Sequence, residues 1–123
     1  MNEIIIESGS IKLVAGLYNT PTANEIIKAL PLEGTANVWG KEVYFVSPLY
    51  INPEPDAREE VEEGELAFWP VGSAFCIFFG PTPVSTGNKP RAYSPVNVFG
   101  RITGDLSLLN NIRQDDPISI TLK

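Results

Sequence analysis

Hydrophobic and polar residues alternate along most of this chain, and the alternation predicts β-strands. In residues 10–17, apolar side chains at every second position indicate a strand with one buried face. Residues 74–79 are apolar at every position, which is typical of a strand that is covered on both faces. Glycine and proline separate the runs. The pattern predicts eight strands, at residues 2–7, 10–17, 35–39, 42–47, 66–69, 74–79, 96–102 and 117–122.

Two further stretches repeat apolar residues with helical spacing. The first helix is expected to begin after Thr20, whose side chain can cap it, with Pro21 in the first turn, and to end at Pro31. The second follows Asp105, another capping residue. The apolar stripes are Ala23, Ile26, Ile27 and Leu30 in the first helix, and Leu108, Leu109 and Ile112 in the second.

These elements predict a mainly β fold. Strands that are joined by short connections pair in antiparallel fashion, and closing the sheet on itself removes exposed edges. The expected architecture is therefore a closed eight-stranded antiparallel barrel whose open ends are capped by two α-helices. The chain has 123 residues and no internal linker, so residues 1–123 are expected to form a single domain.

Composition narrows the possible partners and the chemistry. The net charge of −6 disfavours nucleic acid, which requires clustered Lys and Arg. The chain has no histidine, which excludes His-dependent nucleophilic catalysis and removes the commonest zinc ligand. A single cysteine excludes an internal disulfide and favours a reducing, cytoplasmic location. No signal peptide or membrane-spanning run is evident. We expect no metal, no cofactor and no membrane partner, and the sequence specifies no oligomeric state.

Acidic side chains concentrate in residues 54–65, and a charge run of this kind predicts a solvated loop. Calcium-binding loops place carboxylates at alternate positions around a central glycine, and this order is missing here. The segment either docks a basic partner or keeps the protein soluble. A second loop, rich in Ser, Thr, Gly, Asn and Pro, is predicted for residues 84–94.

The order of the predicted elements resembles that of the cyclophilins, with one helix after the second strand and one after the seventh. Three short stretches carry the likeness: Gly-Glu-Leu-Ala-Phe-Trp at 64–69, Gly-Ser-Ala-Phe-Cys-Ile at 72–77 and Val-Phe-Gly-Arg-Ile at 98–102. Two longer patterns resemble a small prokaryotic group of cyclophilin-like proteins of uncertain function. These are Asn-x-Trp-Gly-x-Glu-x-Tyr-Phe at 37–45 and Trp-Pro-x-Gly-x-Ala-x-Cys-Ile-Phe-Phe-Gly-x-Thr-Pro at 69–83. The resemblance covers essentially the whole chain.

The same resemblance implies that the isomerase chemistry of cyclophilins is lost. Those enzymes use an arginine on the third strand to polarise the prolyl amide, and residues 37–45 contain none. Ala74 stands at the position of the family's glutamine, Cys76 at that of the aromatic pocket wall and Val96 at that of the histidine. A replacement donor would have to come from Arg91 or Arg101.

The resemblance also implies a ligand groove on the outer face of strands three to six. Alternation along residues 74–79 puts three small or apolar side chains on that face, and the two tryptophans can form its aromatic walls. Two polar residues of the 42–47 strand would lie at its rim, although an exposed hairpin face is the commoner place for them. The candidate groove residues are Trp39, Glu42, Tyr44, Trp69, Ala74, Cys76, Phe78, Thr82 and Arg91.

We expect a domain that binds a small molecule or an extended peptide in this groove, without efficient prolyl isomerase activity. Two alternatives stay open. One is a weak or altered peptidyl-prolyl cis-trans isomerase; the other is an enzyme of another class, with Glu42, Tyr44 and Arg91 converging on one cavity as acid–base and anion-binding groups. Cys76 lacks a histidine base and is expected to be a small apolar residue. Asn97, within an apolar strand, is expected to satisfy a buried backbone group.

Overall fold

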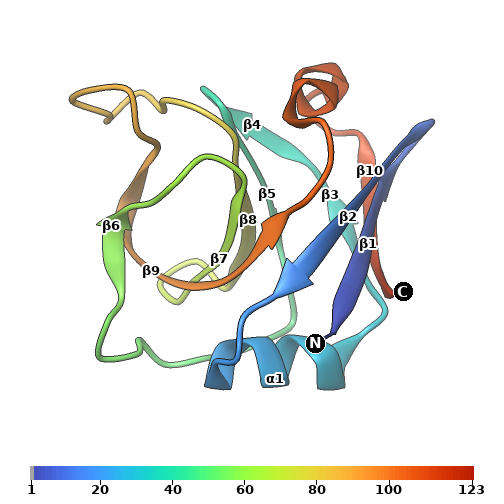
Figure 1. Ribbon diagram of the computed structural model, residues 1–123, viewed down its shortest axis with the longest axis horizontal. Coiled ribbons are helices and arrows are strands. Elements are labelled where there is room, and N and C mark those ends of the chain that lie inside the picture. The colour runs from blue at the N-terminus through green and yellow to red at the C-terminus, as the bar shows by residue number, and fades with distance from the viewer. Residues whose placement is uncertain (1) are drawn as a thin grey trace.

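A single sheet of ten strands makes up most of the protein in this computed structural model, which describes residues 2–123 (Figure 1). Every strand pairing in it is antiparallel. The prediction of a mainly β, antiparallel fold with two helices is confirmed. The strands are β1 (Glu3–Ser8), β2 (Ile11–Leu17), β3 (Leu32–Thr35), β4 (Asn37–Trp39), β5 (Glu42–Val46), β6 (Arg58–Glu60), β7 (Glu65–Trp69), β8 (Ala74–Phe78), β9 (Arg91–Ile102) and β10 (Pro117–Leu122); the helices are α1 (Pro21–Ala29) and η1 (Leu106–Asn111).

The sheet is not a closed barrel, and the predicted closure is wrong. Its hydrogen-bonded order is β3-β10-β1-β2-β9-β7-β8-β5-β4, with β6 paired to β9 off this path, so β3 and β4 are edges. The two edge strands are consecutive in the chain and are joined through Ala36 alone. The segment before β10 occupies the gap between them: the Ala36 N–H donates to the Asp116 carbonyl, and the Val38 N–H donates to Gln114 Oε1 at 2.9 Å. The edges are thus capped by a loop instead of by each other.

The two helices lie at opposite ends of the curved sheet (Figure 1). The Thr20 hydroxyl accepts a hydrogen bond from the Ala23 N–H at 3.0 Å, and Pro21 begins α1, as the sequence predicts. Asp105 caps η1 as predicted, but η1 is a 3₁₀-helix and not an α-helix. Its six residues are more than the three or four that most 3₁₀ segments contain. Neither helix within residues 2–123 has the length and apolar character that a membrane crossing requires.

Two strands have no counterpart in the prediction because their residues are poor strand signals. Strand β3 contains Gly34, where a Cβ would lie 2.5 Å from a ring carbon of Phe45, so this glycine permits close packing on the core. Strand β6 is charged and lies in the segment that was expected to be a solvated loop; it pairs with β9. Strand β9 also begins at Arg91, within the predicted loop at 84–94.

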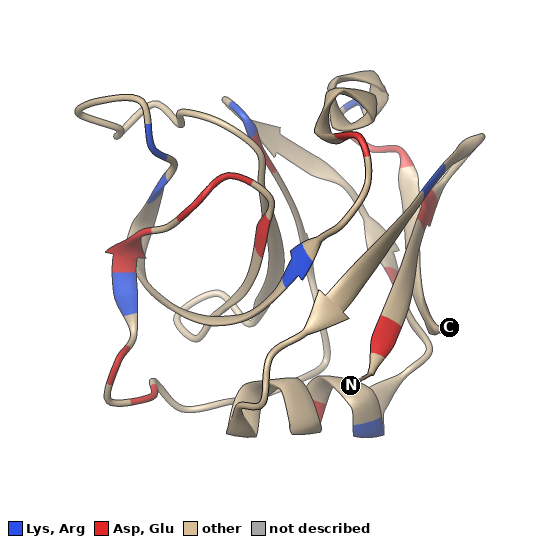
Figure 2. Cartoon of the chain, viewed as in Figure 1, with Lys and Arg blue, Asp and Glu red and all other residues tan. Residues whose placement is uncertain are grey.

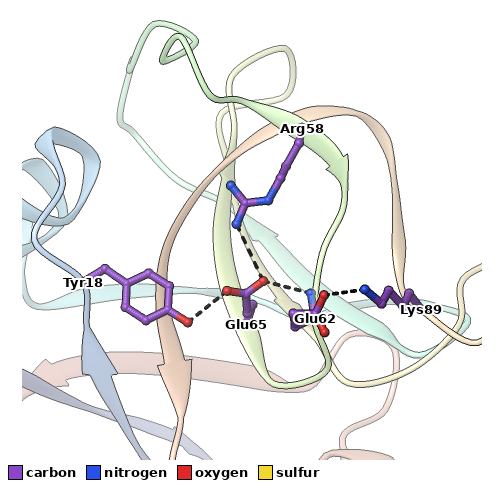
Figure 3. A network of polar contacts seen from close by, with 5 residues as sticks. All are labelled: Tyr18, Arg58, Glu62, Glu65 and Lys89. Carbon is purple, nitrogen blue, oxygen red and sulfur yellow. Dashed lines mark hydrogen bonds and ion pairs between the residues drawn. The ribbon is translucent and has the colours of Figure 1, made fainter.

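The acidic residues of this segment are mostly exposed, but Glu65 is buried against the sheet. Figure 2 shows them along β6 and along the chain that leads from it to β7. Glu65 is buried and accepts hydrogen bonds from the Tyr18 hydroxyl at 2.9 Å and from the Glu62 N–H at 2.8 Å (Figure 3). Arg58 lies 3.9 Å from Glu65, and Lys89 pairs with Glu62 at 2.9 Å. The expectation of a solvated loop is therefore wrong for Glu65.

The sheet is covered on both of its faces around β8, all of whose residues are buried. Phe75 and Ile77 point into the inner core, where Phe75 stacks on Phe45 at 5.2 Å and meets Phe99 edge to face. The alternate residues belong to a second group, called here the outer cluster. Its buried members are Val61, Ala67, Ala74, Cys76, Phe78, Ala92, Val96 and Val98, with Tyr44 and Trp69 packed against them.

The predicted role of Asn97 is confirmed. Its side chain is 1% exposed, its amide donates to the Asn52 carbonyl at 2.9 Å and its amide oxygen accepts from the Glu54 N–H at 2.8 Å. These bonds tie the irregular segment before β6 to the middle of β9. We infer that Asn97 stabilises the segment from which β6 begins.

Replacing Asn97 with Ala is expected to lower the free energy of unfolding by about 1–3 kcal/mol, because two backbone groups lose their partner. Urea denaturation followed by circular dichroism measures this change. Asn88 is exposed, and its replacement with Ala is the matched control, with an expected effect within about 0.5 kcal/mol. Equal midpoints for the two variants would contradict this role.

Candidate functional site

A cavity of about 240 Å³ opens on the outer face of the sheet, beside the outer cluster. Strands β4, β5, β7, β8 and β9 all contribute side chains to it. Its surface is largely aromatic and apolar, with one ionisable carboxyl group. The lining residues are Trp39, Glu42, Tyr44, Trp69, Cys76, Phe78, Ala92, Tyr93 and Val96.

Strand register explains why the β5 and β8 residues meet in the cavity. Side chains two positions apart on a strand share a face, so Glu42 and Tyr44 point the same way, as do Cys76 and Phe78. The two pairs lie directly opposite each other, with Glu42 beside Phe78 and Tyr44 beside Cys76. One face of this strand pair therefore forms the floor of the cavity.

Three aromatic rings form its walls. The ring of Tyr93 lies 6.3 Å from that of Trp39 and 6.1 Å from that of Trp69, with interplanar angles of 67° and 77°. Trp69 is oriented by a hydrogen bond from its indole N–H to the Ser94 hydroxyl. Tyr93 is 71% exposed, so it stands at the mouth between the two indoles. The Tyr93 ring is thus steeply inclined to both indole rings.

Glu42 is the single ionisable carboxyl in the cavity. It is only 5% exposed, which corrects the expectation that it lies on an exposed hairpin face. Burial raises the pKa of its carboxyl to about 7, and the neighbouring Cys76 thiol opposes this shift in part. Near neutral pH the cavity therefore holds a carboxyl group that is divided between its neutral and charged forms.

Cys76 lies beside this carboxyl and is fully buried. Burial raises the pKa of its thiol well above the ordinary value, and the neighbouring Glu42 charge raises that pKa further. Because the thiolate is the nucleophilic form of cysteine, this thiol is inert near neutral pH. Its side chain forms a small, weakly polar part of the cavity floor.

The structure brings together six of the candidate groove residues: Trp39, Glu42, Tyr44, Trp69, Cys76 and Phe78 all line the cavity. Ala74 shares their face of β8 but is buried within the outer cluster and does not reach the cavity. Thr82 donates its hydroxyl hydrogen bond to the Arg91 carbonyl and holds the loop. The Arg91 guanidinium pairs with Glu59 at 2.6 Å. Arg91 therefore does not converge with Glu42 and Tyr44, and the acid–base and anion-binding arrangement considered from the sequence is not formed.

Ala92, Tyr93 and Val96 line the cavity but are absent from the sequence-based set. Residues 84–94 are rich in Ser, Thr, Gly, Asn and Pro, and this composition favoured a loop. The alternation of small and large side chains from Arg91 to Val96 is the signal that could have revealed a strand. Within residues 2–123, no three His, Cys, Asp or Glu side chains are grouped so that they could hold a metal ion.

The chain is similar to a protein family and to two solved structures. A family model described as "Cyclophilin-like" matches residues 2–121. The solution structure of the hypothetical protein AF2241 from Archaeoglobus fulgidus is similar over 99% of this chain and 95% of that chain, with a TM-score of 0.84 and 34% sequence identity. The structure of McbB in complex with tryptophan is similar over 98% of this chain and 44% of that chain, with a TM-score of 0.68 and 18% identity. No protein of curated function matches the chain.

Protonation of Glu42 makes the stability of the fold depend on pH. Between its unfolded pKa of 4.5 and its folded pKa of about 7, the native state holds a proton that the unfolded state has lost, so stability falls as the pH rises. The Glu42→Gln variant lacks this penalty. Relative to wild type, its free energy of unfolding should increase by about 2–3 kcal/mol between pH 5 and pH 8, which urea denaturation at each pH measures.

The exposed Glu63 provides the control, since Glu63→Gln removes the same formal charge outside the cavity. Its difference from wild type should stay nearly constant over this pH range. A pH-independent difference for Glu42→Gln would mean that Glu42 ionises normally in the folded protein.

Proposed function

This chain belongs to the cyclophilin-like protein family, and from that premise we propose that it binds a small organic molecule in the aromatic cavity. The observation that carries the proposal is the combination of three aromatic walls with one buried carboxyl on the floor that has no cationic side chain beside it. Ligand sites are typically concave and mostly apolar, with a few polar groups that fix the ligand's orientation.

The size of the cavity favours a compact ligand. At about 240 Å³ it is smaller than the roughly 300–1,000 Å³ that is typical of sites for drug-sized molecules. A single ring or a short branched chain matches this volume. The aromatic side chains that line the cavity can make stacked or edge-to-face contacts with such a ring.

The surroundings of the cavity favour a small molecule over an extended peptide. A peptide would gain most of its affinity by pairing with an exposed strand edge. The edge strand next to the cavity is β4, and its Val38 N–H already donates to the Gln114 side chain. McbB, solved in complex with tryptophan, is an example of a protein with this fold that holds a small aromatic molecule.

Single-ring compounds should bind and change the tryptophan fluorescence, because the chain's two tryptophans both line the cavity. Phenethylamine, phenethyl alcohol and 3-phenylpropionate are suitable probes, since they share one ring and differ in charge. At least one should give a saturable fluorescence change. The Tyr93→Ala variant should weaken its binding by roughly two- to twelvefold, the equivalent of an aromatic contact of ~0.5–1.5 kcal/mol.

Tyr50→Ala is the matched control, because Tyr50 is 94% exposed and does not line the cavity. It should bind the probes as wild type does. Equal losses in the two tyrosine variants, or no saturable change with any of the three probes, would contradict binding in the cavity.

We expect no prolyl isomerase rate above background. The uncatalysed barrier is ~18–20 kcal/mol, and lowering it requires a donor aimed at the twisting amide. The cavity-lining residues include no arginine or lysine, and Arg91 is paired with Glu59. A protease-coupled assay on an X-Pro peptide at high protein concentration measures the rate. A rate that scales with protein concentration and disappears in Arg91→Ala would support the isomerase alternative instead.

A further inference from the structure

We propose that the cavity selects an organic ammonium group, with Glu42 as its counter-ion and Trp39, Trp69 and Tyr93 as its aromatic walls. The proposal rests on small-molecule binding in this cavity and names the class of ligand. A primary, secondary or quaternary amine attached to a compact apolar group fits it. The groups that surround the Glu42 carboxyl favour a ligand of this class.

The Glu42 carboxyl has no cation to accompany it. Within residues 2–123, the polar group that acts on it is the Cys76 thiol, a weak donor whose hydrogen bond goes to the Ala74 carbonyl at 3.7 Å. No lysine or arginine is among the residues that line the cavity. An ionised carboxylate at this depth is costly unless an opposite charge pairs with it. A ligand that carries a positive charge supplies the missing partner.

The aromatic walls favour the same charge. The face of an aromatic ring is the negative part of its quadrupole, and tryptophan attracts cations most strongly. The Tyr93 ring is inclined to the Trp39 and Trp69 rings by 67° and 77°, and all three side chains line the cavity. Such aromatic boxes recognise ammonium groups in general. The Glu42 carboxyl and the three rings line one cavity, and each of them favours a positive charge there.

Other ligand charges fit less well. An anionic ligand would face Glu42 with no positive side chain to offset it. A neutral ligand would leave the ionised carboxylate unpaired above pH 7. The net charge of −6 also raises the local concentration of cations around the protein. Among the three ligand charges, the cation alone is favoured by each of these features.

The ionisable groups around Glu42 come from three strands. They are Tyr44 on its own strand β5, Cys76 on β8 and Tyr93 on β9; β4 and β7 contribute the tryptophans, which do not ionise. The charged pair of Arg91 and Glu59 lies outside the lining. Glu42 is therefore the group whose charge changes near neutral pH. Because its carboxyl must ionise to pair with an ammonium, ligand binding should release a proton.

Charge-matched probes test the proposal. At pH 8, we expect phenethylamine to bind at least tenfold more tightly than phenethyl alcohol, and 3-phenylpropionate not to bind, as measured by tryptophan fluorescence. Since an alkylamine stays protonated to about pH 10, its affinity should fall about tenfold from pH 8 to pH 6 as Glu42 gains its proton. The affinity of the alcohol should not fall over this range.

Variants at Glu42 separate the counter-ion from the rest of the cavity. Glu42→Gln should reduce the affinity for phenethylamine to that for the alcohol and remove its pH dependence, while Glu63→Gln should leave both unchanged. Calorimetry at pH 7 in two buffers of different ionisation enthalpy should detect proton release on binding of the amine to wild type. The same measurement on Glu42→Gln should detect none.

The outcomes distinguish this inference from the function on which it rests. If the alcohol and the amine bind with equal affinity, ammonium selection is wrong, while small-molecule binding in the cavity stands. If Glu42→Gln keeps the preference for the amine, Glu42 is not the counter-ion and the proposal is overturned. If none of the three probes binds, both the ammonium proposal and the cavity-binding proposal fall.

Discussion

Strand β8 imposes the constraint on which the rest of this structure depends. All five of its side chains, Ala74 to Phe78, are buried, so both of its faces must be covered. On the inner face, Phe75 and Ile77 complete the core with aromatic contacts to Phe45 and Phe99. The outer face has no second sheet packed on it. The first half of β9 and its partner β6 cover part of this face, and the cavity lies beside the covered part.

Polar contacts hold β6 and the segments on either side of it in place. Strand β6 is short and charged, and β-strands of three residues contribute little apolar contact by themselves. Glu65, through its hydrogen bonds with Tyr18 and Glu62, fixes the chain that follows β6 (Figure 3). Asn97 fixes the chain that precedes β6. No buried side-chain nitrogen or oxygen in the described residues lacks a hydrogen bond. Satisfied polar groups of this kind rigidify the segment that they hold.

Strand alternation predicted most of the sheet and four of the nine residues that line the cavity. The faces of β5 and β8 follow from a two-residue period, so Glu42, Tyr44, Cys76 and Phe78 could be grouped before the structure was known. Alternation does not reveal what lies above a face. Tyr93 comes from a strand that prolines and serines disguise as a loop, and its position over the tryptophans depends on the bend of β9. The burial of Glu42 follows from that same cover, more than forty residues away in the chain, which is why a local pattern indicated exposure instead.

The two buried glutamates, Glu65 and Glu42, differ in the groups that surround their carboxyls. Glu65 is 4% exposed, and hydroxyl, backbone and guanidinium groups surround it, so its charge is used within the fold. Glu42 is 5% exposed and has only a thiol beside it. Above pH 7, ionisation of Glu42 costs the fold about 3 kcal/mol, a large part of the stability of a small domain. Nothing within the described residues offsets this cost. A carboxyl whose ionisation destabilises the fold, in a cavity lined by three aromatic rings, is the main structural support for the proposal that the ligand is a cation.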